Sequence, residues 1–217
     1  MEAGCQVEYR KHVQKEKNKR QGEVVLTAAN LFLERGLENV KMTDIADACG
    51  LGVASLYRYF GTKTMLTAAV GERLWQDIIP LFEQNTKNFD RITGLEQLRV
   101  LFGVFPRLYE EHRGFLTFIH DFDTMMLREH VDPASLKSYE DTVLSFYPIF
   151  LGSYRCGRSD GSVRELPDFE TFYFSSTHLL LSLCLKFTVG AVLPIDSEER
   201  QKAELSMALD MILKYLS

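Results

Sequence analysis

Cysteine and tryptophan are scarce in this sequence, which has four cysteines and one tryptophan in 217 residues. Cys5, Cys49, Cys156 and Cys184 show neither the CxxC nor the CxxH spacing of a zinc site or a disulfide framework. We therefore predict reduced thiols, with a disulfide or a zinc site as the alternative. Nothing in the sequence indicates a cofactor, and none is expected.

Long apolar runs are also missing. The longest extends from Leu179 to Leu193, is interrupted by Lys186, and is too short and too polar to cross a bilayer. Residues 1–20 are polar and charged, without the apolar segment of a signal peptide. These absences predict a cytoplasmic protein that makes no contact with a membrane.

Motifs for catalysis are missing as well, since the chain has neither a glycine-rich phosphate loop nor a nucleophile motif. The nearest candidate is the HDFD run with His120, Asp121 and Asp123. Side chains one and two positions apart on a helix point in different directions, so these three cannot form one metal-binding face. We predict that the protein is not an enzyme and has no catalytic or metal-binding residues.

No stretch alternates apolar and polar residues as a strand does, and the chain instead shows helical periodicity, which predicts an all-α fold of about nine helices. The first four are expected at Asn18–Arg35, at two short segments within Met42–Phe60, and at Lys63–Gln84 with a bend near Pro80. Loops are expected at Asn85–Thr93 and Gly157–Pro167. Five more helices are expected at Gly94–Glu111, Gly114–His130, Pro133–Cys156, Phe169–Val192 and Ser197–Leu216.

The stretch Met42–Phe60 has the features of a helix-turn-helix. Thr43 and Asp44 together suit a helix start, and Gly50 suits a helix end in the left-handed conformation. A second short helix begins near Gly52, with Leu56 on its apolar side. The second helix of a helix-turn-helix enters the major groove of DNA. An ordinary helical hairpin is the alternative.

Four motifs lie in and around this stretch, AAxLFxERG, IADACGL, LYRYF and TKxxL, within a resemblance that runs without a gap from about Val24 to Val70. Together they resemble the N-terminal domain of the TetR family of transcriptional regulators. The resemblance implies a three-helix DNA-binding domain at residues 18–66 and a helical effector-binding and dimerisation domain at residues 67–217. Residues 1–17 remain as a basic leader, which we expect to be flexible, with a contact to DNA as the alternative.

The resemblance also implies which residues contact the operator. Gly52, Val53 and Ala54 replace the polar residues that the family often has there, so we expect contacts with thymine methyl groups. Ser55 and Arg58 are the candidates for polar base readout, with Arg58 expected to reach a guanine. The remaining candidates are expected to contact or orient the phosphate backbone, with Thr43 and Thr62 as helix caps: Lys41, Thr43, Tyr57, Tyr59, Thr62 and Lys63.

The distribution of charge agrees with DNA contact at one end. Residues 1–63 contain ten Lys and Arg against eight Asp and Glu, a net charge of +2, which leaves −7 for the rest of a chain whose total is −5. A basic end on an acidic body is typical of a protein that touches DNA with that end alone.

Large aromatic side chains and methionines recur with helical spacing in the body. Because bulky rings leave irregular space between helices, and because the family places its effector there, we expect a hydrophobic or aromatic small-molecule effector; a plain packed core is the alternative. His120, Asp121, Asp123 and His178 are polar groups that could orient it. The candidate ligand residues are Phe102, Phe105, Tyr109, Phe118, Phe122, Met125, Tyr147, Phe150 and Tyr154.

The last two predicted helices carry more apolar surface than one bundle core needs. In the family two such helices from each subunit form the dimer interface, so we expect a homodimer that binds a palindromic operator and, on binding effector, shifts the helix that begins at Lys63. Repression is the expected outcome. The alternative is a DNA-binding protein of the same fold that a protein partner controls instead of a small molecule.

Overall fold

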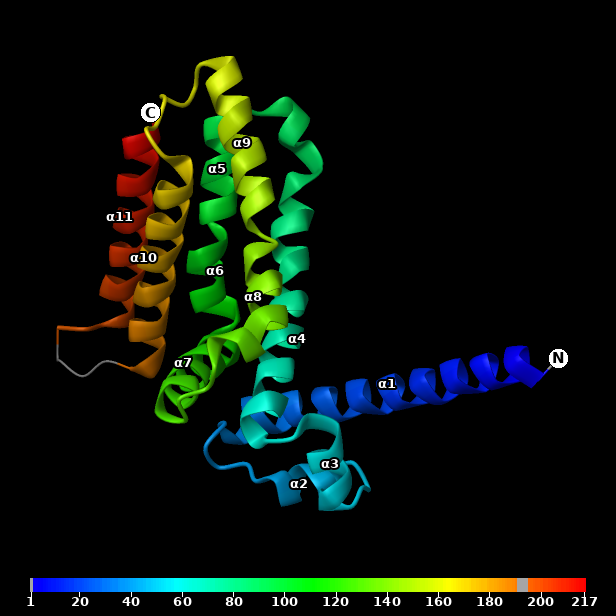
Figure 1. The fold of residues 1–217 in the computed structure, drawn as a ribbon. Coiled ribbons are helices and arrows are strands. Elements are labelled where there is room, and N and C mark those ends of the chain that lie inside the picture. The colour runs from blue at the N-terminus through cyan, green and yellow to red at the C-terminus, as the bar shows by residue number, and fades with distance from the viewer. Residues whose placement is uncertain (1, 191–194) are drawn as a thin grey trace.

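The computed structural model describes residues 2–190 and 195–217, and for residues 2–11, 13 and 85 it describes the backbone alone. Within these residues all regular structure is helical, as the sequence predicts (Figure 1). The α-helices are α1 (Glu2–Arg35), α2 (Met42–Ala48), α3 (Val53–Phe60), α4 (Lys63–Glu83), α5 (Gly94–Phe102), α6 (Val104–Glu111), α7 (Arg113–Arg128), α8 (Lys137–Leu144), α9 (Tyr147–Asp160), α10 (Phe169–Val189) and α11 (Glu198–Leu216), with 3₁₀ turns η1 (Gln84–Arg91) and η2 (Pro133–Leu136).

Each predicted helix is present, but two of them are divided. The segment predicted as one helix from Gly94 is split into α5 and α6 at Gly103. The segment predicted from Pro133 is split into η2, α8 and α9. The break between α8 and α9 has a physical cause, because Pro148 lies at the start of α9 and has no N–H to donate to the preceding turn. Pro80, by contrast, lies inside α4 without ending it.

Several boundaries differ from the sequence prediction. Helix α9 ends at Asp160 and not at Cys156, so the first four residues of the loop expected at Gly157–Pro167 are helical. Helix α1 begins at Glu2 and not at Asn18, so most of the segment expected to be a flexible leader forms the N-terminal part of a long helix. In Figure 1 this part projects beyond α3, with no other element beside it. The segment after α4 that was expected to be a loop forms η1. Helix α10 ends at Val189, and the predicted end at Val192 lies outside the described residues.

Helix α4 connects the N-terminal head, formed by α1–α3, to the body. Figure 1 shows α4 rising from the head along α8 and α9. Its contact with α8 is unusually close, because a Cβ atom at Gly71 would lie 2.9 Å from the ring of Tyr139. One turn further along α4, the indole N–H of Trp75 donates to the Tyr139 hydroxyl at 2.9 Å. A movement of α8 would therefore change the packing of α4, the helix that connects the head to the body.

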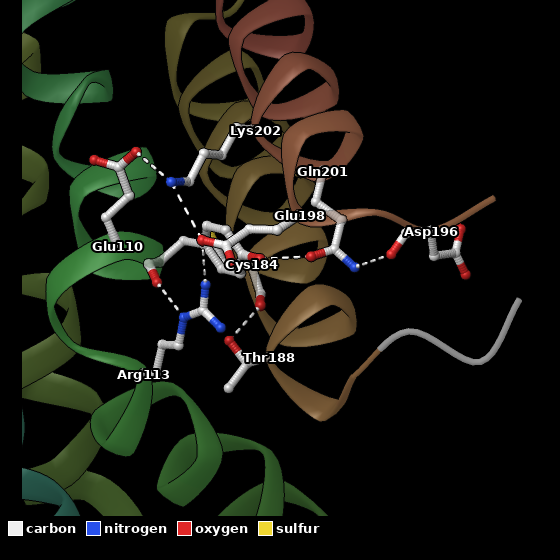
Figure 2. Close-up of polar contacts among 9 residues, drawn as sticks. Glu110, Arg113, Cys184, Thr188, Asp196, Glu198, Gln201 and Lys202 are labelled. Carbon is white, nitrogen blue, oxygen red and sulfur yellow. Dashed lines mark hydrogen bonds and ion pairs between the residues drawn. The ribbon is translucent and has the colours of Figure 1, made fainter. Parts of the chain in front are cut away.

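A polar cluster fastens the start of α11 to the junction between α6 and α7 (Figure 2). The Arg113 guanidinium donates to Glu198 at 3.1 Å. Lys202 lies 3.2 Å from the same carboxylate and 3.7 Å from Glu110. These ion pairs are at the surface and contribute about 0–1 kcal/mol each to stability. Beneath them, the buried hydroxyl of Tyr109 bonds the Gln201 amide oxygen at 2.5 Å.

Helices α10 and α11 lie side by side on one side of the body (Figure 1). Their inner faces are packed, and their outer faces carry large exposed apolar side chains, which include Leu179, Met207, Met211 and Tyr215. Helix α10 is long and apolar enough to cross a membrane, judged by length and composition alone, and it is the one helix among the described residues of which this is true. Its contacts with α6, α7 and α11 are those of a bundle helix.

Candidate nucleic-acid interface

The head contains the helix-turn-helix that the sequence predicts. Helix α2 ends at Ala48, and Gly50 adopts φ +62°, a conformation that favours glycine. The turn is closed by the Leu51 N–H, which donates to the Ala46 carbonyl at 2.9 Å. Ala46 and Leu56, one from each helix, are completely buried where the helices pack. This packing fixes α3 relative to α2 and α1.

The outer face of α3 is free of other elements in the described part of the chain. Ala54, Tyr57 and Arg58 are exposed, as is Gly52 at the N-cap, whereas only Leu56 of this helix is fully buried. The exposed residues come from the N-terminal half of α3 and from its next turn, which is the part that meets base edges when such a helix enters the major groove. Val53, Ser55 and Tyr59 are half-buried. All the predicted base-contacting residues therefore lie together on α3.

Arg58 is the one basic side chain on α3. Its guanidinium is held loosely: one Nη donates to the Ser55 hydroxyl at 3.4 Å, and the group lies 5.6 Å from the centre of the Tyr59 ring. Both contacts keep the guanidinium on the outer face without burying it. Arginine presents a planar pair of donors that matches the two acceptors of guanine in the major groove.

Tyr57 and Tyr59, which were both expected to contact phosphates, differ in exposure. Tyr57 is 49% exposed. Tyr59 is half-buried, its ring lies edge-on to Phe60, and its carbonyl accepts a hydrogen bond from Gln21 of α1 at 3.2 Å. Tyr57 is thus the better placed of the two for a phosphate contact, and Tyr59 also helps to fix α3 to α1.

Lys63 has a structural role in this head. Its ammonium donates to the Leu37 carbonyl at 2.7 Å and lies 5.9 Å from the centre of the Phe32 ring. Partial burial lowers the pKa of Lys63 below its ordinary value. The side chain thereby ties the start of α4 to the connection between α1 and α2, so the predicted phosphate contact would require it to leave the Leu37 carbonyl.

The cap of α2 differs from the prediction that Thr43 would occupy it. Helix α2 begins at Met42, so Lys41 is at the cap position and Thr43 lies inside the first turn, exposed. The cap hydrogen bond comes from Asp44, whose carboxylate accepts from the Lys41 N–H at 2.7 Å. This leaves the Lys41 ammonium and the Thr43 hydroxyl on the surface, where both can reach a phosphate.

Thr62 caps α4 as the sequence predicts. Its hydroxyl accepts from the Met65 N–H at 3.1 Å. Only Gly61 and Thr62 separate α3 from α4, so the positive end of the α4 helix dipole lies near the C-terminal end of α3. A phosphate there would meet both the exposed Thr62 and the helix end.

The body contains a small aromatic cavity of about 110 Å³ between α4, α6, α8, α9 and α10. Its lining is Trp75, Phe82, Phe105, Val143, Phe146, Phe150, Tyr173, Phe174, Thr177, His178 and Leu181. Of the predicted ligand residues, only Phe105 and Phe150 belong to this lining. His178 also belongs to it, as the sequence suggested, whereas His120, Asp121 and Asp123 do not.

The other predicted ligand residues serve the packing of the body. Phe118, Phe122 and Met125 lie buried on α7, where Phe122 stacks on Tyr139 at 4.5 Å. Tyr154 stacks on Phe169 at 4.2 Å, and its hydroxyl accepts from the Leu166 N–H. The rest are also in packing contacts: Phe102 with Phe150, Tyr147 with Tyr173, and Tyr109 with Gln201.

Sequence reasoning missed most of the cavity wall. Trp75 and Phe82 come from α4, and Tyr173, Phe174 and Leu181 come from α10. Helical periodicity shows that such residues share a face but not which other helix that face meets. Trp75 lies one helical turn after the closely packed Gly71, but nothing in the sequence links that position to the rings of α10.

A family model described as bacterial regulatory proteins, tetR family, matches residues 25–70. The HTH-type transcriptional repressor KstR2 of Rhodococcus jostii (strain RHA1) is 26% identical over 158 residues, which make up 71% of this chain and 72% of that protein. The matched family segment contains the helix-turn-helix and the start of α4.

Solved structures resemble the whole chain. Thermus thermophilus FadR, a TetR family transcriptional repressor solved in complex with lauroyl-CoA, has a TM-score of 0.65 at 18% identity and covers 91% of this chain and 95% of its own. RolR, solved in complex with resorcinol, has a TM-score of 0.65 at 15% identity and covers 94% of this chain and 90% of its own. At such identities the likeness shows the fold alone.

Proposed function

We propose that this chain, a member of the TetR family of bacterial regulatory proteins, is a cytoplasmic transcriptional repressor with no catalytic activity. As a homodimer it binds a palindromic operator, with one α3 in each half-site, and a small hydrophobic or aromatic effector releases it. The observation that carries the proposal is the outer face of α3, where Arg58 and Tyr57 are exposed on a head that packs against α4.

The DNA contacts follow from the exposed groups of the head. Arg58 supplies base readout, and Gly52 and Ala54 allow α3 to approach the base edges closely, since neither has a side chain larger than a methyl group. Lys41 and Tyr57 reach the phosphates on the two sides of the helix. Phosphate contacts give affinity that depends on salt, and base contacts give specificity.

Dimerisation is supported by the outer faces of α10 and α11. Leu179 is 45% exposed, Met207 62%, Met211 61% and Tyr215 53%. Isolated exposed apolar residues are common, but two adjacent helices with such residues on one face form a patch of the kind that marks an interface. Pairing of two copies through these helices gives a four-helix contact and holds two heads on the same side.

Effector control is supported by the cavity and by its connection to α4. Two proteins of the same fold have been solved with small molecules, FadR with lauroyl-CoA and RolR with resorcinol. In this chain Trp75 belongs to the cavity wall and also donates to Tyr139, which packs on Gly71 of α4. An effector that displaces the Trp75 ring would change the packing of α8 on α4 and hence the separation of the two heads. A coupling of about 1–3 kcal/mol is enough to change the affinity for the operator 5- to 150-fold.

Selection of bound fragments from random duplex DNA tests the proposal. The selected sequences should contain two copies of one half-site in inverted orientation, since a two-fold symmetric dimer reads the same bases twice. Arg58→Ala serves as the matched control and should fail to enrich the same half-site. The proposal that a dimer binds a palindromic operator would be overturned if no sequence were enriched, or if only a single half-site without symmetry were enriched.

A further inference from the structure

The aromatic cavity has properties that narrow the class of effector. We propose that it binds an uncharged compound with a single aromatic ring and an oxygen substituent, of which phenol is the simplest. This inference rests on the proposed function, since it names the effector class of a regulator. It concerns a binding reaction that can be measured without DNA.

The size of the cavity sets the upper limit on the ligand. Its volume is about 110 Å³. An engineered apolar cavity of about 150 Å³ binds benzene, and drug-sized ligands occupy about 300–1,000 Å³. One six-membered ring with a small substituent therefore matches the space, and two fused rings exceed it.

The wall favours a flat ring. Phe82 lies 4.7 Å from Phe146 and 6.1 Å from Phe150, and Trp75 lies 5.7 Å from Phe146, as measured between ring centres. The interplanar angles of these pairs are 56–61°. Such tilted rings present both edges and faces, and an inserted aromatic ring can make edge-to-face contacts with several of them. A saturated ring of the same size would lose these contacts.

The lining excludes charge. None of the eleven lining residues is Asp, Glu, Lys or Arg, and His178 lies exposed at the edge. A carboxylate or an ammonium would therefore lose its hydration without gaining a partner of opposite charge. Neutral compounds are selected.

One polar group in the wall is left without a partner. Tyr173 is 5% exposed, and its hydroxyl has no hydrogen-bond partner in the described part of the chain. Burial raises the pKa of Tyr173 to about 12. Like any tyrosine at neutral pH, it carries a protonated hydroxyl that can donate. Beside it, the Thr177 hydroxyl donates to the Tyr173 carbonyl at 2.9 Å and retains lone pairs that can accept. A phenolic oxygen can both accept from Tyr173 and donate to a neighbour.

The single tryptophan of the chain provides the measurement. Because Trp75 is the one tryptophan in the sequence and lies in the cavity wall, its fluorescence reports occupancy directly. The full-length protein without DNA would be titrated with phenol, toluene, benzoate and 1-naphthol, with the indole excited at the red edge of its absorption. We expect phenol to bind saturably and more tightly than toluene, and benzoate and 1-naphthol not to bind.

Tyr173→Phe tests the hydrogen bond. It should weaken phenol binding about 5- to 10-fold, the usual effect of one neutral hydrogen bond, and leave toluene binding unchanged. Tyr147→Phe is the matched control, because the Tyr147 ring meets the Tyr173 ring edge-on at 5.0 Å but does not line the cavity. If Tyr173→Phe fails to fold, the four-compound comparison on the unaltered protein still decides.

Three results would overturn the inference: benzoate or 1-naphthol that binds as tightly as phenol, equal binding of phenol and toluene, or no saturable binding of any compound. A protein that gives one of these results and still enriches a symmetric operator would remain a repressor of the proposed kind. A protein that binds phenol as expected but no DNA would instead refute the proposed function.

Discussion

Replacement of Arg58 by alanine separates base readout from phosphate binding. The structure predicts that this change leaves the fold intact, because the guanidinium is exposed and its contacts are weak: a 3.4 Å hydrogen bond to Ser55 and a 5.6 Å approach to the Tyr59 ring. The free energy of unfolding should therefore change by less than about 0.5 kcal/mol, as is usual at surface positions. Any larger effect on DNA binding then arises at the interface.

The expected size of that effect follows from the chemistry of the contact. A bidentate arginine–guanine pair contributes about 1–3 kcal/mol of discrimination against another base, or about 5- to 150-fold per half-site. The variant should bind the operator more weakly by that factor for each of the two half-sites, and it should no longer distinguish the operator from a duplex in which the contacted guanine is replaced. The unaltered protein should retain the distinction.

Fluorescence anisotropy with labelled duplexes at several salt concentrations measures both quantities. Lys41→Ala is the control, because its exposed ammonium is expected to meet a phosphate: it should weaken binding to all duplexes equally and reduce the salt slope by about 0.9 for each lost contact. Lys63 is unsuitable as a control, since its ammonium is bound to the Leu37 carbonyl. If Arg58→Ala and Lys41→Ala behave alike, Arg58 contacts only the backbone and the assignment of base readout is wrong.

Further predictions concern the body. Gly71→Ala places a Cβ 2.9 Å from the packed ring of Tyr139 and should destabilise the protein by about 1–2 kcal/mol, as measured by urea unfolding. Gly22→Ala, whose Cβ would meet nothing within 4 Å, should instead stabilise the protein by up to about 1 kcal/mol. Equal effects of the two substitutions would refute the close contact at Gly71. Cys184 is buried and its pKa is raised to about 12, so alkylation at neutral pH should spare it until the protein unfolds. In the unfolded protein the Cys184 thiol releases its proton near its ordinary pKa of 9.0, whereas in the folded protein it keeps its proton to a higher pH. The free energy of unfolding should therefore fall as pH rises from about 9 toward 12, and Cys184→Ala should lessen that fall. Met211→Glu changes a side chain that is 61% exposed and should give folded monomers in sedimentation, and a dimer of unchanged affinity would contradict the assigned interface.

The head could be predicted closely because its signals are local. The limits of α2 and α3 depend on Gly50, on the apolar residues of each helix and on short-range capping, all within about twenty residues of sequence. The capping residue itself was predicted wrongly, since Asp44 and not Thr43 forms the cap hydrogen bond. Either side chain suits the position, and the exact start of the helix decides between them.

The cavity could not be predicted because its wall is assembled from five helices. Phe82 of α4 meets Phe146, the N-cap residue of α9, and Phe150 within α9, and Phe150 in turn meets Tyr173 of α10; the members of each pair lie far apart in sequence. Helical periodicity identified the aromatic faces, and from them we predicted ligand residues on α5, α6, α7 and α9. Most of these side chains pack in other parts of the body and do not line the cavity. The tie between Lys63 and Leu37 is equally long-range, and resemblance to a family gave no sign of it.

The proposed function depends on one claim, that a symmetric pair of chains presents two α3 helices to the same duplex. Native mass spectrometry of the protein on the DNA that it selects measures this directly. The account predicts two chains on each duplex that carries both half-sites, and a dimer in the absence of DNA. A single chain on the duplex and a monomer in solution, or no complex with any duplex, would contradict it.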